Sequence, residues 1–256
     1  MVPSMEARGE PLDHALAVVT AASREGIPVR LIGGLAVRYL CSSFPARTRD
    51  DQDVDLASVS RARARLGEVL ASHGFVPDKQ FNSLYGHKQM YFRSPDGEWA
   101  VDVIIDRLDM CHVLDFRDRI ERMPFTLDVI DLLLSKLQIV EINEKDLQDV
   151  LYLLSAFPVK EGDEPGTIGP ARLCAIVCQD WGWWRTVSGN LDRIASLPEE
   201  DRARLIPAGA PFDPVEQAAR LRREAEDTPK TLKWKLRSKV GDRVQWYKLP
   251  EEVAHH

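Results

Sequence analysis

Apolar and polar positions follow two different periods along this chain, and the change falls near residue 125. Before it, short strand-like runs alternate with helical stretches and glycine turns. From Thr126 to about residue 226, helical spacing dominates. The pattern therefore predicts an α+β fold, with a short mixed sheet flanked by helices, followed by a mainly helical domain.

The first part contains elements of both kinds. Helical spacing is found at residues 11–25, 35–43 and 61–74. Strand patterns are found at residues 27–34 and 53–59. Residues 88–106 predict a hairpin, because Pro95, Asp96 and Gly97 supply turn chemistry between two alternating runs. We place a first domain at residues 1–125, a helical domain at 126–228 and a basic, aromatic tail at 229–256.

The segments 126–142 and 144–157 are the clearest helices of the second part. In the first of them, Lys136 stands within an apolar stripe, so its ammonium must either reach the surface or meet an anion. The opposite side of this helix is expected to be the wet face, and it carries Asp128, Asp131, Ser135 and Gln138.

Composition narrows the class of protein. With 256 residues, 44% hydrophobic and 29% charged, the chain is long enough for a sizeable core. We expect a cytoplasmic protein without membrane contact, because we find neither a membrane-length apolar run nor a signal peptide. The net charge of −6 opposes general adhesion to nucleic acid but allows a local basic groove. The four cysteines are too scattered for a disulfide framework, and Cys174 and Cys178 are expected to pack in the core.

Four carboxylates are crowded into residues 50–55. An EF-hand loop starting at Asp51 would need Gly at position 6 and Glu at position 12, where this chain has Leu56 and Ala62. We therefore exclude a calcium loop. Asp50 and Asp51 are expected in a solvated loop, where Arg47 and Arg49 offset their charge.

The strand pattern suggests a different use for the other two carboxylates. Along residues 53–56, Asp53 and Asp55 point to one face and the apolar side chains to the other. The hairpin strand adds Asp102 if the two strands are neighbours, and Asp106 is the alternative member. Three such carboxylates can hold divalent cations that clamp a triphosphate. Gly33 and Gly34 would let the backbone and the following helix N-terminus approach a phosphate.

These residues resemble a known family. The segment "IGGLAV", the loop with Arg49, "DVDL" and the later "VDV" are similar to the nucleotidyltransferase fold of the DNA polymerase beta superfamily. The branch they most resemble is that of the AbiE-type and MenT-like toxin nucleotidyltransferases. The resemblance implies Mg²⁺ or Mn²⁺ on Asp53, Asp55 and Asp102, and a nucleoside triphosphate at Gly33, Gly34 and Arg49. The long loop before Asp53 and the Gly at position 34, where many members have Ser, depart from the pattern.

The resemblance extends into the helical part. Toxin-like relatives have a Lys that Lys136 matches, and a Lys-Asp-x-x-Asp segment that residues 145–149 match. Lys136 would contact the triphosphate, and Asp149 would act as a base or orient Lys136. Snorkelling of Lys136, and a surface pair between Lys145 and Asp149, are the alternatives.

The function implied is transfer of a nucleoside monophosphate to an acceptor hydroxyl, with release of pyrophosphate. An RNA end such as that of tRNA is the implied acceptor, in a toxin-like role with an antitoxin partner. A small-molecule or protein acceptor and an inactive nucleotide-binding module are the rivals.

Two further features admit more than one interpretation. The tryptophans of residues 180–191 are expected to pack between helices, and an aromatic platform for a base is the alternative. The tail places lysines and arginines among Trp234, Trp246 and Tyr247, which suits nucleic acid as well as solubility. His255 and His256 are given no role.

Overall fold

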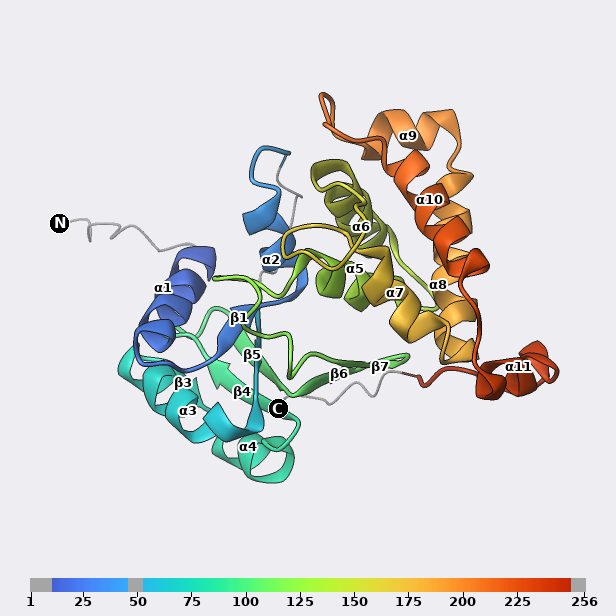
Figure 1. Ribbon diagram of the computed structural model, residues 1–256. Helices are drawn as coiled ribbons and strands as arrows, with labels where there is room; N and C mark the ends of the chain where they lie inside the picture. Colours follow the sequence, from blue (N-terminus) through green and yellow to red (C-terminus); the bar gives the residue numbers. More distant parts are fainter. Residues whose placement is uncertain (1–10, 46–52, 250–256) are drawn as a thin grey trace. The chain divides into compact units, whose positions relative to one another are not determined.

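The computed structural model of the chain describes residues 11–45 and 53–249, which form two compact units (Figure 1). The first unit comprises residues 11–39, 53–106 and 117–127. The second comprises residues 40–45, 107–116 and 128–249. Each unit is thus assembled from separate stretches of chain, and the domain limits at 125 and 228 stay predictions.

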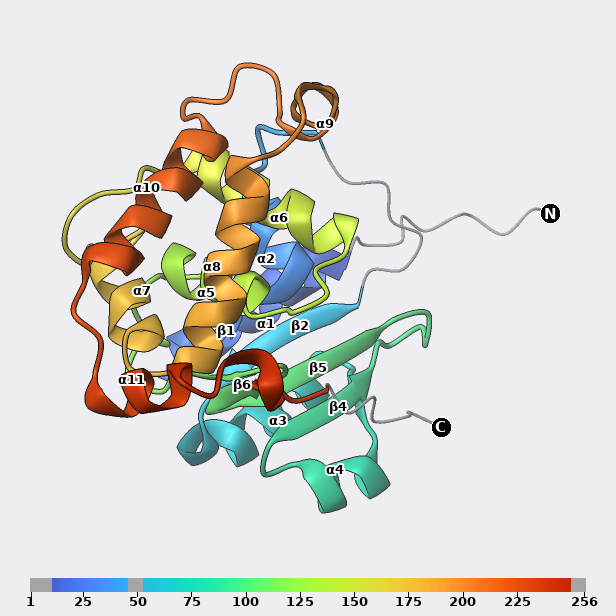
Figure 2. The same cartoon turned by 90° about the vertical axis from the view of Figure 1, so that its right-hand side faces the viewer.

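The first unit is built on a five-stranded sheet with the order β1-β2-β5-β4-β3 (Figure 2). Its strands are β1 (Val29–Leu31), β2 (Val54–Ser58), β3 (Val76–Pro77), β4 (Gln89–Arg93) and β5 (Ala100–Ile105). Only the central pair, β2 and β5, is parallel among these strands; the other neighbours are antiparallel. The sheet is therefore mixed, as the sequence predicts, and the hairpin β4–β5 is confirmed.

The two faces of this sheet differ in the way the alternation predicts. Val54, Leu56, Val101, Val103 and Ile105 are each 2% exposed or less, so they form the apolar face. Helices α1 and α3 pack against each other in this unit, and α1 contacts β1 and β2. The helices of the unit are α1 (Pro11–Arg24), α2 (Gly33–Leu40), η1 (Ser60–Ala62), α3 (Arg63–Ser72) and α4 (Lys79–Tyr85).

The second unit is mainly helical. Its helices are α5 (Val129–Leu137), α6 (Glu144–Ala156), α7 (Pro170–Val177), α8 (Trp181–Ala195), α9 (Glu199–Leu205), α10 (Pro214–Asp227), α11 (Leu232–Ser238) and η2 (Gly241–Arg243). A two-stranded ribbon, β6 (Arg107–Asp109) with β7 (Val113–Asp115), belongs to the same unit. Helix α10 packs on α6, α7 and α8, and α5 packs on α6, α7, α8 and β7.

The prediction that one face of α5 is exposed to solvent is wrong. Asp128, Asp131 and Gln138 are 0% exposed and Ser135 is 4% exposed, because neighbours surround the helix on all sides. Their side-chain oxygens have local hydrogen-bond partners, whereas Gln138 Nε2 has none among the described residues. Asp131 accepts a hydrogen bond from Arg172 Nε at 2.9 Å, Asp128 Oδ1 accepts from Gly166 N at 3.0 Å, and Gln138 Oε1 accepts from His112 N at 3.1 Å.

The fold class is α+β, with a mixed five-stranded sheet flanked by helices and a mainly helical second unit. Within residues 11–45 and 53–249, every helix is too short or too polar to span a bilayer.

Candidate active site

Two carboxylates predicted from the sequence are direct neighbours across the central strands. Asp55 of β2 and Asp102 of β5 are register partners in the parallel pair. Register partners point to the same face of a sheet, so both side chains lie on the face opposite the apolar core. Both residues are only partly exposed. Like charges so close together raise the cost of ionisation unless a cation or donors sit between them.

Asp53 stands two residues before Asp55, just outside β2. Its Oδ1 accepts a hydrogen bond from the backbone N–H of Ala100 at 3.1 Å. The Asp53 carboxylate, like that of Asp102, raises the pKa of Tyr91, so it lies near the same face of the sheet. Among the described residues, no three acidic, histidine or cysteine side chains are gathered closely enough to hold a metal ion. The arrangement is therefore a carboxylate pair, and Asp53 lies beside it, hydrogen-bonded to a backbone amide.

The glycine turn lies directly against this pair. Gly33 has φ +72°, and a Cβ built on it would lie 2.2 Å from Asp55 Oδ2. The preceding residue, Ile32, donates its N–H to the carbonyl oxygen of Asp55 at 3.0 Å. Only glycine combines this backbone conformation with so close an approach. The sequence thus places a glycine where the chain must touch the carboxylate.

Helix α2 starts at this turn and has no acidic residue in its first turn. Its N-terminal amides and the positive end of its dipole suit an anion. Gly34 is the second residue of the helix and is buried. The chemistry of this turn suits the predicted phosphate contact of Gly33 and Gly34, which stays a prediction. Arg49, along with Arg47, Asp50 and Asp51, lies outside the described residues.

Strand β4 adds three side chains to the same face that sequence reasoning missed. Gln89, Tyr91 and Arg93 alternate with the buried Met90 and Phe92. The Gln89 amide donates a hydrogen bond to Asp102 Oδ1, which holds that carboxylate in place. The alternation in "QMYFR" is the signal that could have found these residues.

The pKa of Tyr91 reflects the negative charge of this face. It is the register partner of Asp102 on β4. Burial raises the pKa of the Tyr91 phenol, and the carboxylates of Asp102 and Asp53 raise it further. A tyrosine on this face therefore stays protonated and can donate a hydrogen bond.

Asp106, the alternative to Asp102, has a different place. It is the one non-glycine residue with positive φ among the described residues, at 65°. Its N–H donates to Ser58 O and its Oδ1 accepts from Ser60 N, both at 2.9 Å. Asp106 thus joins the ends of β2 and β5, and it stabilises the turn after β5.

Lys136 and Asp149 come together in the second unit. Lys136 Nζ lies 3.1 Å from an Asp149 oxygen and 2.6 Å from Asp146 Oδ1, and the Asp149 side chain is 1% exposed. Burial lowers the pKa of the Lys136 ammonium, but Asp149 and Asp146 outweigh it, so the pKa is raised. The lysine therefore meets anions rather than snorkelling. The contact of Lys136 with a triphosphate stays a prediction.

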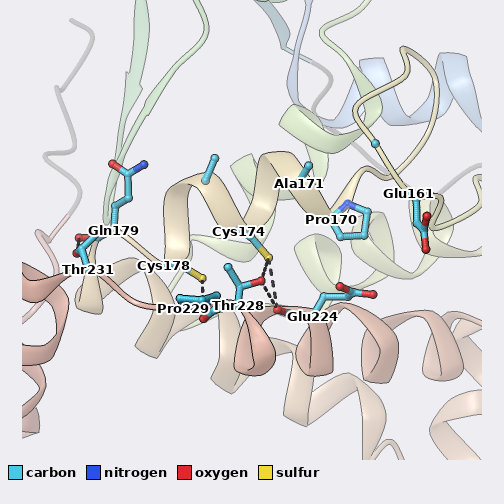
Figure 3. Close-up of a pocket in the computed structure, with 12 residues that line it drawn as sticks. Glu161, Pro170, Ala171, Cys174, Cys178, Gln179, Glu224, Thr228, Pro229 and Thr231 are labelled. Carbon is cyan, nitrogen blue, oxygen red and sulfur yellow. Dashed lines mark hydrogen bonds between the residues drawn. The ribbon is translucent and has the colours of Figure 1, made fainter.

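The cysteines are all free and buried, in agreement with a packing role. Cys174 and Cys178 lie at an open hollow of about 590 Å³ between α7 and the end of α10 (Figure 3). The Thr228 hydroxyl donates to Cys174 Sγ at 3.4 Å. Burial raises the pKa of Cys178 to about 11 and that of Cys41 to about 12. Such thiols are protonated at neutral pH and are poor nucleophiles.

No protein-family model matches this sequence, and no curated protein matches it significantly. Solved structures give weak likenesses. An antigenic nucleotidyltransferase-like protein from Paracoccidioides brasiliensis has a TM-score of 0.40 and 17% identity over 78% of this chain and 95% of its own. A STING-associated CdnE c-di-GMP synthase from Capnocytophaga granulosa has a TM-score of 0.29 and 12% identity over 84% and 79%.

The Cid1 poly(U) polymerase has a TM-score of 0.27 and 11% identity, over 73% of this chain and 66% of its own. All three TM-scores are 0.40 or lower. Likenesses this weak carry no functional conclusion for this chain.

Proposed function

We propose that this chain is a nucleotidyltransferase that moves a nucleoside monophosphate from a nucleoside triphosphate to an acceptor hydroxyl. The observation that carries the proposal is the register pair of Asp55 and Asp102 against the Gly33 turn. A pair of carboxylates beside a helix N-terminus provides a cation site next to a phosphate site.

Mg²⁺ or Mn²⁺ is the cation that fits this donor set, because carboxylate oxygens are hard ligands. Asp55 and Asp102 would hold it, and Asp53 would join them by exchanging its bond to Ala100 for the ion. When bound, the ion would neutralise charge on the triphosphate and lower the pKa of the attacking hydroxyl. Gln89 would orient Asp102 through the hydrogen bond it already makes.

The reaction then follows from the chemistry of the substrate. The acceptor oxygen forms a bond to the α-phosphorus, the bond from that phosphorus to the pyrophosphate oxygen breaks, and the acceptor loses its proton. The amides at Gly33 and Gly34 would hold phosphate oxygens as pyrophosphate leaves. Within this proposal the acceptor is an RNA end such as that of tRNA, and a toxin-like role with an antitoxin partner stays a prediction.

The test is transfer of label from each of four α-labelled nucleoside triphosphates, with Mg²⁺ or Mn²⁺, into a mixture of cellular RNA, protein and small molecules. We expect label in the RNA fraction. Asp55→Asn and Asp102→Asn should each lower it by about 100-fold or more, because each removes a ligand of the ion.

Asp201→Asn is the matched control, because Asp201 is a surface carboxylate paired with Arg204. It should leave transfer unchanged. Label in the protein or small-molecule fraction would show that the acceptor is a protein or a small molecule and not RNA. Tight triphosphate binding without transfer to any fraction would instead identify a nucleotide-binding module.

A further inference from the structure

The second unit has an open hollow of about 780 Å³ that the proposed reaction does not use. It is lined by the chain around His112, by the end of α7 and the start of α8, and by the segment that follows α10. Three aromatic side chains line it, Trp183, Trp246 and Tyr247. A volume of this size is in the range of sites for small organic ligands and nucleotides.

The C-terminal wall of the hollow is held by specific contacts. Trp246 Nε1 donates to Thr186 Oγ1 at 3.0 Å, and the Trp246 ring meets Trp181 edge to face at 6.0 Å. The backbone N–H of Lys248 donates to Cys111 O at 3.0 Å. A Cβ on Gly182 would lie 2.6 Å from Trp246 O, so glycine is needed for this approach.

The floor of the hollow contains a neutral histidine. His112 is 7% exposed, and its Nε2 shares a hydrogen bond of 2.9 Å with Thr186 Oγ1. Its ring lies 5.0 Å from that of Trp183 at an interplanar angle of 30°. Thr186 therefore connects the floor of the hollow to the wall through Trp246.

The charge of the wall is opposite to that of the whole chain. Residues 229–248 contain seven lysines and arginines and one acidic residue, whereas the net charge of the chain is −6. Lys233 and Lys248 line the hollow, beside Asp180 and the amides of Gln179 and Gln245. The Lys248 ammonium is paired with Asp109 at 2.8 Å, and Asp180 Oδ1 accepts the backbone N–H of Trp183 at 3.0 Å, so Lys233 is the lysine here that can meet a phosphate. Helix α11 packs on α8 (Figure 1). Lys233 of this helix lines the hollow, and the end of the helix is fixed by Arg237 over the Trp181 ring at 4.5 Å.

We propose that this hollow binds a base of a single-stranded nucleic acid, with a neighbouring phosphate on Lys233. Aromatic rings stack on any base, amides pair with base edges, and lysines hold the backbone. The binding stands independently of catalysis; its use as the site for the acceptor strand rests on the proposed function. A duplex has no free base to insert, so it should bind weakly.

Fluorescence anisotropy of labelled ten-nucleotide single strands, with the full chain and no triphosphate, tests this site. Because no transfer takes place, a failed binding test is distinct from a failed transfer reaction. Tyr247→Ala and Lys233→Glu should each weaken binding by about tenfold, from lost stacking and reversed charge. Lys235→Glu, the same charge change on the same helix but outside the hollow, should weaken it less than about threefold.

A second variant guards against misfolding. Gly182→Ala should push the Trp246 backbone away and abolish binding, whereas Gly189→Ala on the same helix should not, because its nearest neighbour is a flexible Arg185 side chain at 3.4 Å. Both should keep the far-ultraviolet circular dichroism of the native chain. Comparing binding of RNA strands with binding of DNA strands shows which of the two nucleic acids the hollow prefers.

The proposal is overturned if neither strand binds, or if Lys235→Glu weakens binding as much as Lys233→Glu. Equal binding of a duplex or of a poly-glutamate peptide would also overturn it, because each would indicate a general anion or protein surface.

Discussion

Gly26 and Gly33 have almost the same backbone at the residue scale, with φ of +67° and +72°. Their surroundings differ. A Cβ on Gly26 would meet nothing within 4 Å, whereas one on Gly33 would overlap Asp55 Oδ2. The first glycine only ends a helix, and the second brings the chain against a carboxylate. A pair of substitutions can therefore separate backbone strain from damage to the site.

Gly26→Ala and Gly33→Ala should each lower the free energy of unfolding by about 1–2 kcal/mol, because alanine is strained at these φ values. Only Gly33→Ala should also displace Asp55 and reduce nucleotidyl transfer by about tenfold or more. Urea unfolding and the labelled-triphosphate assay measure the two effects. Equal transfer by both variants would show that the Gly33 turn is not needed for the reaction.

At the scale of elements, α5 shows how packing overrides a sequence pattern. Its spacing predicts one apolar and one wet face, yet Asp131 is enclosed with Arg172, whose NH2 also donates to Asp115 O at 2.9 Å. Gln138 Oε1 accepts a hydrogen bond from the backbone N–H of His112. These bonds tie α5 to α7 and to the β6–β7 ribbon. A buried ionic pair of this kind is costly to break from one side.

His112 gives the second unit a pH dependence. Burial lowers the pKa of His112 to about 4 from 6.5. The unfolded chain therefore binds a proton between these two pH values that the folded chain does not. The stability that the neutral ring contributes is fully present above pH 6.5 and is lost as the pH falls towards 4.

Between pH 7.5 and 4.5, the native chain should therefore lose about 2–3 kcal/mol more unfolding free energy than His112→Gln, which has no titrating ring. Urea unfolding of both chains at the two pH values gives the difference. Parallel losses in the two chains would show that His112 is protonated in the folded state or that other groups dominate.

At the scale of the whole molecule, the proposed function places metal and triphosphate at the carboxylate pair. In the absence of a cation, Asp55 and Asp102 repel each other across the strands. A cation removes that repulsion and adds binding energy. Under the proposed function, the site would then give up stability without metal in exchange for activity with metal.

In EDTA, Asp55→Asn should thus be as stable as the native chain or more stable. With Mg²⁺ and triphosphate at about 100 times their Kd, the native chain should gain about 2.7 kcal/mol and Asp55→Asn much less. Thermal or urea unfolding, with and without the ligands, measures this reversal. Equal stabilisation of both chains would place the ligands away from Asp55.

The parts of the site that the sequence predicts are those that follow from local period. Asp55 and Asp102 alternate with buried residues on their own strands, so the local period assigns each to the polar side of its strand. The two polar sides form one face only because β2 and β5 pair. Gln89 and Tyr91 carry the same signal and were missed, because a polar alternation without carboxylates is common on exposed strands. The role of Lys136 depends on Asp146 and Asp149, which lie on another helix.

The sequence by itself determined the order of the elements in residues 11–74, the hairpin at Gly97, the apolar face of the sheet and the glycine turn before α2. Each depends on residues a few positions apart. Tertiary structure alone decided the parallel pairing that sets Asp55 opposite Asp102, the burial of the polar side of α5, and the return of the tail onto α8. These depend on which distant segments share one core, and local hydrophobic period carries no information about that choice.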